Sequence, residues 1–399
     1  MKSWLPPGGG NLFQEIKRVC QEAEASGQTL YRLSIGQPAG PALESACLKA
    51  AECVQSKEER WHEYQDNTCV PIPDFARRFA QAHVIRTDLA GLGDQIDTMP
   101  IPGIKPMLGL VQLACLGPER HIHIKGMTAP GYPVPETQAK YQGLPYRPFG
   151  TGPSNSFLPE FERAYSFTVN REIKELAMLN LPHNPSGQIA TREYWLKVCA
   201  YCAKHDIRLF NDGAYLALAH DIDCCALADV APEFPELSWL EAYSASKSIA
   251  NGTGWRVGAV VVSPDFVGDL RTIKGNTDSG FFAPAAAGAL HALETDQDGV
   301  LYSCDVYGTR LKMLISWLKE RGLKLAVEPG AGFFTLWEAP KSAFGRCLEN
   351  ARDFNLTMIK EAGIVGVHFD PYIRYAVCGP IEEWVDQIQD AFNRANVSY

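Results

Sequence analysis

The chain has 399 residues, which exceeds the size of an ordinary single domain and predicts a large core with a smaller second domain. Hydrophobic residues make up 46% and charged residues 21%, which are ordinary values for a globular protein. The net charge of −9 does not indicate the excess of basic residues that is typical of nucleic-acid-binding proteins. No apolar run approaches the roughly 20 residues of a membrane-spanning helix, and residues 1–10 lack the apolar core of a secretory signal. We therefore expect a cytoplasmic protein that binds neither nucleic acid nor membrane.

The N-terminal region begins with an amphipathic pattern. Residues 11–28 have apolar side chains on one side and charged ones on the other, which predicts a helix. A short apolar strand then turns at Gly36, where the missing side chain permits close backbone approach. Helices are predicted at about 43–56 and 74–86. The segment 61–67 between them mixes aromatic with polar residues, a composition typical of binding loops and interfaces.

From residue 100 onward, helical and strand patterns alternate, which is typical of a mostly parallel α/β sheet. A helix is predicted over 107–115, with Pro106 in its first turn and the backbone amides of Ile104 and Lys105 free to bind an anion. Ligands of such sheets lie beyond the carboxyl ends of the strands, so we expect functional residues there. Five buried strands are predicted, at 121–125, 176–181, 207–211, 237–243 and 256–262.

The C-terminal third predicts a different architecture. The segment 284–321 is mainly helical and connects to a second domain of α+β character. Strands are predicted at 332–337 and 373–378, and helices at about 341–362 and about 381–394. With no internal repeat, the chain reads as one two-domain unit, with a large domain over 40–290 and a small domain made of 1–39 and 291–399.

Twelve cysteines spread along the chain fit reduced core thiols better than a disulfide framework. Four of them, in two pairs, would allow a structural zinc site: Cys199, Cys202, Cys224 and Cys225. The first pair belongs to a helical repeat of apolar residues with Trp195 and Val198, which indicates a buried helix face. Adjacent cysteines also suit joint ligation of one ion poorly. We therefore predict no metal site.

Lys247 lies in a loop that begins at a strand end and contains small hydroxyl residues and two glycines. An amine partly removed from water has a lowered pKa and can form a Schiff base with an aldehyde at neutral pH. Ser244, Ser246 and Arg256 in the same stretch could bind an anion beside it. A solvated surface lysine in a glycine-rich loop is the alternative that this stretch alone leaves open.

Three polar side chains on other strand ends indicate what this lysine binds. Asp212 ends an apolar strand, where a buried carboxylate needs a cation such as a protonated pyridine nitrogen. Tyr215 and Asn184 can contact the ring oxygen of such a pyridine, and the anion-binding groups beside Lys247 and at the helix start can hold its phosphate. These features describe pyridoxal phosphate. Each residue alone also fits a turn, a loop or the core.

Five segments, in this order, resemble the motif set of class I aminotransferases, the fold-type I family of pyridoxal-phosphate enzymes: Asn184-Pro-Ser-Gly187, Asp212-Gly-Ala-Tyr215, Ser244-Ala-Ser-Lys247, Gly254-Trp-Arg256 and Ile373-Arg374. The resemblance extends over nearly the whole chain. It implies an α/β fold in which a large domain holds a mostly parallel seven-stranded sheet between helices and a smaller domain is α+β.

The resemblance also implies roles for single residues. Lys247 would form the Schiff base with the cofactor and move the substrate proton, and Asp212 would keep the pyridine nitrogen protonated. Tyr132 resembles the aromatic residue that stacks on the ring, with a turn tyrosine as the alternative. Arg374 resembles the arginine that binds the substrate α-carboxylate, with a surface charge at a strand edge as the alternative, and Gly36 resembles the glycine whose backbone contacts the same group.

Two residues are implied to act across a subunit boundary. Tyr64 resembles the tyrosine that reaches the cofactor phosphate of the other subunit, which implies a homodimer with shared active sites. Leu12-Phe-Gln-Glu-Ile16 and Lys274-Gly-Asn-Thr-Asp-Ser-Gly280 are similar to the LL-diaminopimelate aminotransferase branch, and Asn276 would reach the neighbouring site. The implied substrate contacts are Gly36, Asn184, Arg374 and Asn276.

The chain departs from the family pattern at three positions. Asn11 stands where a tyrosine is expected, Gln37 stands where an acidic residue is expected, and Gly252 lengthens the spacing between Lys247 and Arg256 by one. The first two positions bear on the substrate. The third bears on the contact of Arg256 with the phosphate.

We therefore predict a pyridoxal-phosphate-dependent aminotransferase. It would move an amino group between an amino acid, such as LL-diaminopimelate or a related dicarboxylic or broad-range donor, and a 2-oxo acid such as 2-oxoglutarate. A C–S β-lyase on the same fold is one alternative, because cofactor binding does not decide which bond breaks. A non-catalytic pyridoxal-phosphate-binding regulatory protein is the alternative from another class.

Overall fold

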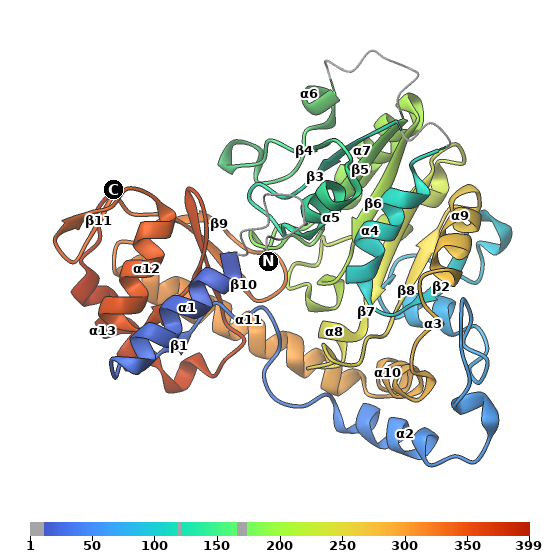
Figure 1. The fold of residues 1–399 in the computed structure, drawn as a ribbon, viewed down its shortest axis with the longest axis horizontal. Coiled ribbons are helices and arrows are strands. Elements are labelled where there is room, and N and C mark those ends of the chain that lie inside the picture. Colours follow the sequence, from blue (N-terminus) through green and yellow to red (C-terminus); the bar gives the residue numbers. More distant parts are fainter. Residues whose placement is uncertain (1–11, 118–120, 166–173) are drawn as a thin grey trace, which may run out of the picture.

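The computed structural model describes residues 12–117, 121–165 and 174–399. Figure 1 shows a larger part built on a seven-stranded sheet and a smaller part, at the left, built on a four-stranded sheet. The N-terminal helix lies with the C-terminal elements in the smaller part. Asn11, one of the three departures from the family pattern, lies outside the described residues.

The strands of the larger sheet are β2 (Asp97–Ile101), β3 (Ile122–Gly126), β4 (Tyr146–Pro148), β5 (Lys174–Leu179), β6 (Ile207–Asp212), β7 (Trp239–Ser244) and β8 (Gly258–Val262). Their spatial order is β2-β8-β7-β6-β5-β3-β4. All neighbours pair in parallel except β8, which is antiparallel to both β7 and β2. The predicted seven-stranded, mostly parallel sheet is therefore confirmed.

Five of these strands lie where the sequence predicts them, and β2 and β4 were missed. β2 contains Asp97 and Pro100, and β4 has three residues and ends in Pro148, so neither has a long apolar run. Both lie at the edges of the sheet. Proline is tolerated there because one side of an edge strand needs no ladder hydrogen bond.

Helices cover both faces of this sheet (Figure 1). On one face the core joins α2 (Glu44–Val54), α3 (Phe75–Gln81), α7 (Arg192–His205) and α10 (Ala283–Thr295). On the other it joins α4 (Ile104–Ala114), α5 (Val134–Gln142) and α9 (Pro264–Gly275). Because both faces are covered, β7 and β8 are buried at every position, which explains their nearly continuous apolar sequences.

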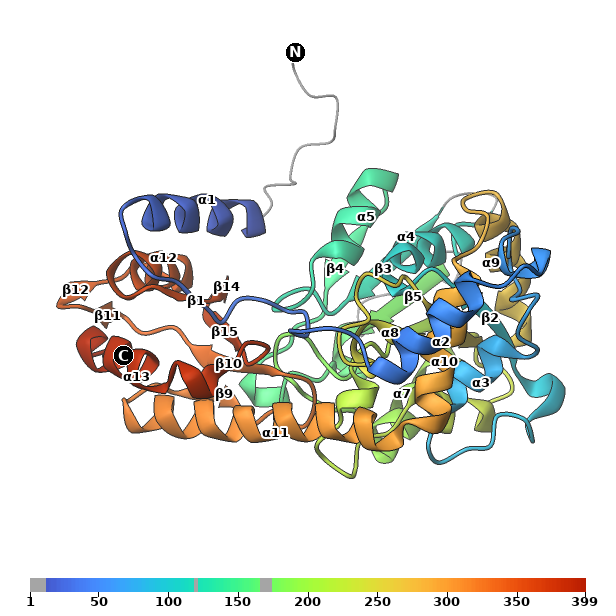
Figure 2. The same cartoon turned by 90° about the horizontal axis from the view of Figure 1, so that it is seen from below.

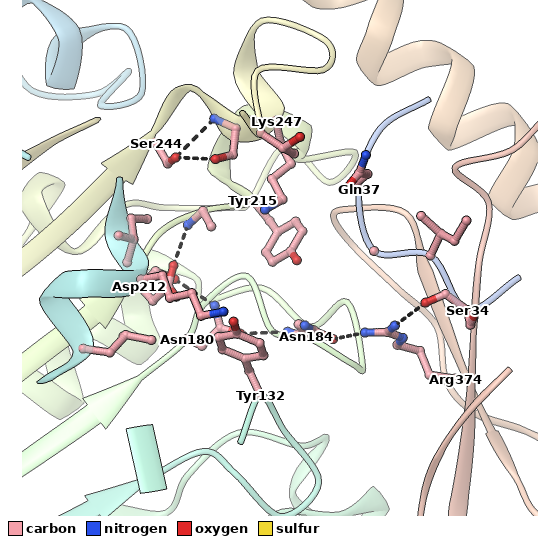
Figure 3. A pocket seen from close by; sticks show the side chains of 18 of the residues that line it. Ser34, Gln37, Tyr132, Asn180, Asn184, Asp212, Tyr215, Ser244, Lys247 and Arg374 are labelled. Carbon is pink, nitrogen blue, oxygen red and sulfur yellow. Dashed lines mark hydrogen bonds between the residues drawn. The ribbon is translucent and has the colours of Figure 1, made fainter. Parts of the chain in front are cut away.

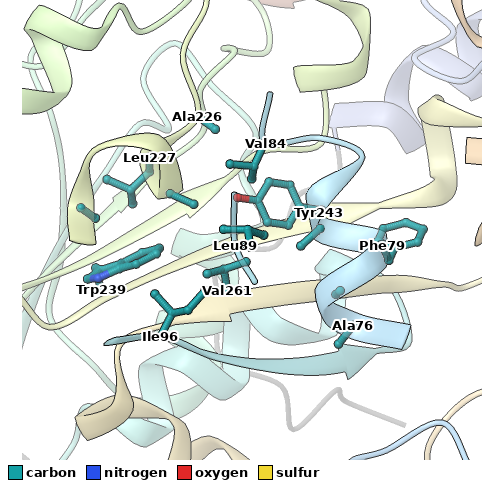
Figure 4. Close-up of a cluster of buried hydrophobic side chains, with 14 of the residues drawn as sticks. Ala76, Phe79, Val84, Leu89, Ile96, Ala226, Leu227, Trp239, Tyr243 and Val261 are labelled. Carbon is teal, nitrogen blue, oxygen red and sulfur yellow. The ribbon is translucent and has the colours of Figure 1, made fainter. Parts of the chain in front are cut away.

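Figure 4 shows part of the first of these cores. Phe79 of α3 and Tyr243 and Trp239 of β7 pack with Val261 of β8 and Leu227. The predicted buried face of α7 joins the same core: Trp195, Val198, Cys199 and Cys202 are all buried. Burial raises the pKa of the Cys199 and Cys202 thiols, so both stay neutral. Within the described ranges, no group of three or more His, Cys, Asp or Glu residues could hold a metal ion.

The smaller part is α+β. Its four-stranded sheet has the order β14-β15-β10-β9, with β9 (Leu325–Val327), β10 (Phe334–Glu338), β14 (Val367–Phe369) and β15 (Tyr372–Ala376). The helices around its core are α11 (Gln297–Glu320), α12 (Ala351–Ala362) and α13 (Val385–Ala395). The N-terminal α1 (Leu12–Ala25) packs on α12 through Ile16, Val19 and Cys20, and β1 (Tyr31–Arg32) pairs with β13 (Ile364–Val365) (Figure 2).

The helix predicted at 341–362 is wrong over its first ten residues. β11 (Ser342–Ala343) and β12 (Arg346–Cys347) form a hairpin there, turning at Phe344, whose φ is +52°. α12 begins only after Asn350, whose side chain accepts a hydrogen bond from the third backbone amide beyond it. The segment predicted as mainly helical over 284–321 is two helices, and Asp296 at the break caps α11.

The remaining elements are short. Helices α6 (Phe161–Tyr165) and α8 (Ala245–Ser248) flank the larger sheet, and 3-10 turns occur at Glu59–Trp61, Gly93–Gln95, Pro153–Asn155, Leu216–Leu218, Leu227–Asp229, Ala231–Glu233 and Ile381–Glu383. The helices predicted near 11–28, 43–56, 74–86 and 381–394 are present with shorter bounds. None of the helices described is both long and apolar enough to cross a bilayer.

Candidate active site

A cavity of about 760 Å³ lies at the carboxyl ends of β5, β6 and β7, where the sequence predicts functional residues. Figure 3 shows side chains from several strand ends converging on it. The predicted residues that line the cavity are Gly36, Ile104, Lys105, Tyr132, Asn184, Asp212, Tyr215, Ser244, Ser246, Lys247, Arg256 and Arg374. The fold therefore brings together residues that lie up to about 340 positions apart in the chain.

Asp212 is the last residue of β6 and is buried. Its carboxylate accepts a hydrogen bond from the Ala214 amide at 3.1 Å, and its carbonyl accepts one from the Asn180 side chain at 3.0 Å. Burial raises its pKa to about 6, although the Ala214 amide and Lys247 oppose this shift. A buried carboxylate held in this way favours a cationic partner in the cavity.

Lys247 lies on α8, directly after β7. The Ser244 hydroxyl caps this short helix by accepting a hydrogen bond from the Ser246 amide at 3.1 Å, and it donates to the Ser246 hydroxyl at 2.8 Å. The Lys247 ammonium is 5.3 Å from the centre of the Tyr215 ring. Burial lowers the pKa of Lys247, and the charge of Asp212 opposes the shift. The amine is therefore more readily neutral than an exposed lysine.

Two tyrosines face the same space. Tyr215 is buried against the edges of Phe333 and Phe334, with ring centres 5.6 Å apart in both pairs. Tyr132, in the turn before α5, lies in Figure 3 beside Asp212 and Asn184. Burial raises the pKa of Tyr132 to about 12, so its phenol is protonated at neutral pH. Both phenols can therefore donate hydrogen bonds.

Arg374, at the centre of β15, is only 3% exposed. Its guanidinium donates to the Asn184 side-chain oxygen and to the Ser34 carbonyl, both at 2.8 Å, and lies 4.2 Å from the centre of the Phe334 ring. Burial lowers its pKa to about 10, which still leaves it charged at neutral pH. Among the described residues, its Nε has no hydrogen-bond partner. A buried cation with a spare donor favours an anionic ligand.

Gly36 lies close to Arg374. A Cβ added to Gly36 would lie 3.3 Å from the Phe334 ring and 3.7 Å from the Arg374 guanidinium, so glycine brings the backbone near this arginine. The neighbouring Gln37 also lines the cavity. This neutral side chain stands where the resemblance to the family leads us to expect an acidic one.

The opposite end of the cavity, at the start of α4 and beside Arg256, also suits an anion. α4 begins at Ile104, three residues earlier than predicted, and Gly103 precedes it with φ of +78°. Arg256 donates to the Thr253 carbonyl at 2.9 Å and packs so tightly on Gly103 that an added Cβ would lie 2.6 Å from its guanidinium. A Cβ on Gly252 would lie 2.3 Å from the Ala245 carbonyl, so the additional glycine lets the loop fold back on α8. Arg256 still lines the cavity.

Tyr64 and Asn276 do not line the cavity. Tyr64 is 79% exposed, and Asn276 is exposed after the end of α9, where its side chain donates to the Thr272 carbonyl. Their loops nevertheless adjoin, because the Ser279 carbonyl accepts hydrogen bonds from the backbone amides of residues 65 and 66. Lys274 joins the loops further.

Lys274 is fully buried and donates to the Asp66 carbonyl at 2.7 Å and to the Asp278 carboxylate at 2.8 Å. The same carboxylate oxygen accepts a hydrogen bond from the Gly280 amide. Sequence reasoning missed this lysine as a structural residue. The two loops that carry Tyr64 and Asn276 thus form one unit on the surface.

Sequence reasoning also missed several lining residues. Asn180, directly after β5, donates to Asp212 and accepts from the Asn184 amide, and its position at a strand end could have indicated it. The others had no comparable sequence signal, since they are brought to the cavity by tertiary packing: Ile16, Lys17, Cys20, Arg32, Ser34, Ile35, Leu108, Ala214 and Thr253.

Comparison with known proteins bears on the chemistry of this cavity. A family model described as aminotransferase class I and II matches residues 28–388. An LL-diaminopimelate aminotransferase of Methanocaldococcus jannaschii is 27% identical over 92% of this chain and 85% of its own. One of Gloeobacter violaceus is 29% identical over 96% of this chain and 95% of its own.

Solved structures match the fold. An aspartate aminotransferase mutant of Thermus thermophilus, 19% identical, superposes with a TM-score of 0.81 over 98% of this chain and 97% of its own. A probable N-succinyldiaminopimelate aminotransferase of the same species, 22% identical, has a TM-score of 0.80 over 96% of this chain and all of its own. These findings confirm the predicted fold class and favour neither the C–S β-lyase nor the regulatory alternative. The chain belongs to the class I and II aminotransferase family, and it is a pyridoxal-phosphate-dependent enzyme that moves amino groups between amino acids and 2-oxo acids.

Proposed function

We propose that this aminotransferase uses LL-diaminopimelate as amino donor and 2-oxoglutarate as acceptor. The observation that supports the donor is the name shared by the relatives cited above, which match 92–96% of this chain. The length of the match means that the comparison extends well beyond one motif.

The side chains present fit the cofactor. The buried Asp212 carboxylate needs a cation, which a protonated pyridine nitrogen supplies, and Tyr215 and Asn184 are donors for the ring oxygen. Tyr132 offers an aromatic face beside them. When bound, the cofactor supplies an electron-withdrawing ring that accepts the negative charge left as the substrate α-proton departs.

Lys247 is proposed to attach to the cofactor and to take and return the substrate proton. Its lowered pKa supports this role, because a neutral amine can act as a base near pH 7. The Asp212 carboxylate is proposed to pair with the protonated pyridine nitrogen, which balances its buried charge. Both residues lie on adjacent strand ends, so the sheet holds them in one geometry.

The phosphate is proposed to lie at the start of α4. Five residues that line the cavity support this placement: Ile104, Lys105, Ser244, Ser246 and Arg256. They could supply two helix-start amides, two hydroxyls and one permanent cation. Such a set combines directional donors with charge, which suits a phosphate.

The substrate α-carboxylate is proposed to bind Arg374. The spare Nε donor, the burial and the close approach of the Gly36 backbone support this role. Asn184, already bonded to Arg374, would contact the same group. Arg374 and Lys247 then lie on two parts of the molecule, one on each side of the substrate.

We further propose a homodimer in which the unit formed by the Tyr64 and Asn276 loops completes the partner's site. The exposure of both residues and the clasp around Lys274 support this arrangement. A complementation experiment tests it. A Lys247→Ala chain and a chain with Tyr64→Ala and Asn276→Ala are each nearly inactive alone, and mixed dimers regain activity because one site then has all its residues.

A mixture that stays inactive after unfolding and refolding together, while each variant still dimerises, would contradict shared sites.

The division into a domain over 40–290 and a domain of 1–39 with 291–399 is part of the proposal. It is supported by a core in which Leu33 packs with residues from 307 onward, joined by Tyr215 and Leu218 at the junction of the two domains. The cytoplasmic location stays a prediction.

The donor is tested by mixing the cofactor-loaded enzyme with single amino acids and following the change in cofactor absorbance. LL-diaminopimelate is expected to react faster than glutamate, alanine or phenylalanine in this first half-reaction. No reaction with LL-diaminopimelate, with reaction of another donor, would remove this substrate and leave the aminotransferase activity intact.

A further inference from the structure

The charges that line the cavity are strongly unbalanced. Among the described lining residues Asp212 is the one acidic side chain, whereas six are cationic: Lys17, Arg32, Lys105, Lys247, Arg256 and Arg374. The proposed binding of the cofactor and of one α-carboxylate accounts for the cations at the strand ends, at the α4 start and on β15. Lys17 and Arg32 are left without a role.

Both residues belong to the N-terminal segment and are held in place by packing. Lys17 follows Ile16 on α1, which packs against α12, and Arg32 lies on β1, which pairs in parallel with β13. In Figure 2 α1 lies along α12, with its N-terminal end towards α5 of the larger part. The two cations therefore form a wall of the cavity that comes from neither the strand ends nor β15.

The charges of both side chains are available to a ligand. Lys17 is exposed and has no ion-pair partner within the described part of the chain. Arg32 uses one nitrogen in a 2.7 Å ion pair with Glu24, and both side chains of that pair are more than 40% exposed. A guanidinium has five N–H donors, so donors remain for a second anion. Gln37, which lines the same region, adds no opposing charge.

We propose that Lys17 and Arg32 form a second anion subsite that binds the carboxylate at the far end of a dicarboxylic amino acid or 2-oxo acid. This inference rests on the proposed function, because it assumes that the α-carboxylate occupies Arg374. LL-diaminopimelate, glutamate and 2-oxoglutarate all have the required second carboxylate. The subsite would make these two residues determinants of specificity, acting on recognition and not on proton transfer.

Matched substrates isolate that carboxylate. Lysine is LL-diaminopimelate without its second carboxylate, and 2-oxopentanoate is 2-oxoglutarate with a methyl group in its place. In the wild type we expect kcat/KM to favour the dicarboxylic member of each pair. Lys17→Gln and Arg32→Gln should each lower that preference about tenfold, mainly through KM, because a charge-assisted hydrogen bond is lost.

Arg18→Gln is the matched control, since Arg18 is the next residue on α1, pairs with Glu22 and does not line the cavity. It should leave the preference unchanged, and Lys17→Arg should retain it. An unchanged preference in the double variant would overturn the subsite. An equal loss for both members of a pair would overturn it too, because it would mean that α1 acts only on folding.

Binding of two inhibitors to the cofactor-loaded enzyme gives a second readout that needs no turnover. Glutarate should bind more tightly than pentanoate, and the double variant should remove the difference. If no donor reacts but this difference is present, the proposed donor and acceptor fail and the subsite stands. If transamination proceeds with no difference between the inhibitors, the subsite fails and the proposed function stands.

Discussion

The two walls of the cavity are built in different ways. On the strand-end wall, Asp212, Asn184 and Ser244 are buried. Asp212 and Asn184 are both hydrogen-bonded to Asn180, and Ser244 is hydrogen-bonded to Ser246. On the N-terminal wall, Lys17, Ile35 and Gln37 are exposed. Burial and fixed hydrogen bonds shift pKa values and set geometry, whereas charges in water attract a ligand without defining a reaction. The strand-end wall therefore suits the chemical step, and the N-terminal wall suits recognition of the substrate.

The largest effect is expected at Lys247. Lys247→Ala should lower the rate of the amino-group transfer by about 10⁴-fold or more, because it removes both the attachment point and the base. Single-turnover mixing with an amino donor measures the rate, and the absorbance maximum of the bound cofactor should shift as well. If the variant kept wild-type rates, the strand-end wall would not be where the chemistry occurs.

Arg374→Lys tests whether Arg374 binds the α-carboxylate while the N-terminal wall binds the carboxylate at the far end. Loss of the forked guanidinium should raise KM about 10- to 100-fold for every amino acid, dicarboxylic or not, since charge-assisted hydrogen bonds to the α-carboxylate are lost. Steady-state kinetics with alanine and glutamate measure the effect. Arg394→Lys, at a surface ion pair with Asp390, serves as the control. An effect confined to glutamate would place the far-end carboxylate at Arg374 and contradict the assignment of the two subsites.

Gly103→Ala tests whether Arg256 helps to bind the cofactor phosphate at the start of α4, which belongs to the strand-end wall. Its Cβ would lie 2.6 Å from the Arg256 guanidinium and must displace it, so we expect the cofactor dissociation constant to rise about tenfold. Gly27→Ala is the control, because Gly27 also has a positive φ but has open space around it. Equilibrium dialysis of both variants measures the constant. Equal losses in the two variants would indicate backbone strain alone and exclude Arg256 from the phosphate site.

The last prediction concerns the stability of the cofactor-free protein and not its activity. The folded-state pKa of Asp212, about 6, lies above its ordinary value of 3.8, so the folded state binds this proton more tightly. The free energy of unfolding should therefore fall by about 3 kcal/mol as pH rises from 4 to above 6. Asp212→Asn should remove that slope in urea titrations. A slope unchanged by the substitution would mean that Asp212 is not desolvated.

The motif residues could be predicted because each follows an apolar strand or begins a helix. Asn184, Asp212 and Lys247 are signalled by the strands before them, and the parallel sheet then places all three at one edge. β2 and β4 were missed because prolines and polar residues at the sheet edges hide their strand character. The hairpin at 342–347 was missed because its turn depends on two positive φ values, which no helical pattern excludes.

What the sequence determined by itself is the order of the elements, the strand-end residues and, through their resemblance to a family, the cofactor. These are local features, since they depend on hydrophobic periodicity and on neighbours in the chain. Only the tertiary structure decided that Lys17 and Arg32 line the cavity, that Lys274 clasps two distant loops and that Arg256 still reaches the cavity despite Gly252. Those contacts arise from packing between segments that are far apart in sequence, and no local pattern encodes which of them meet.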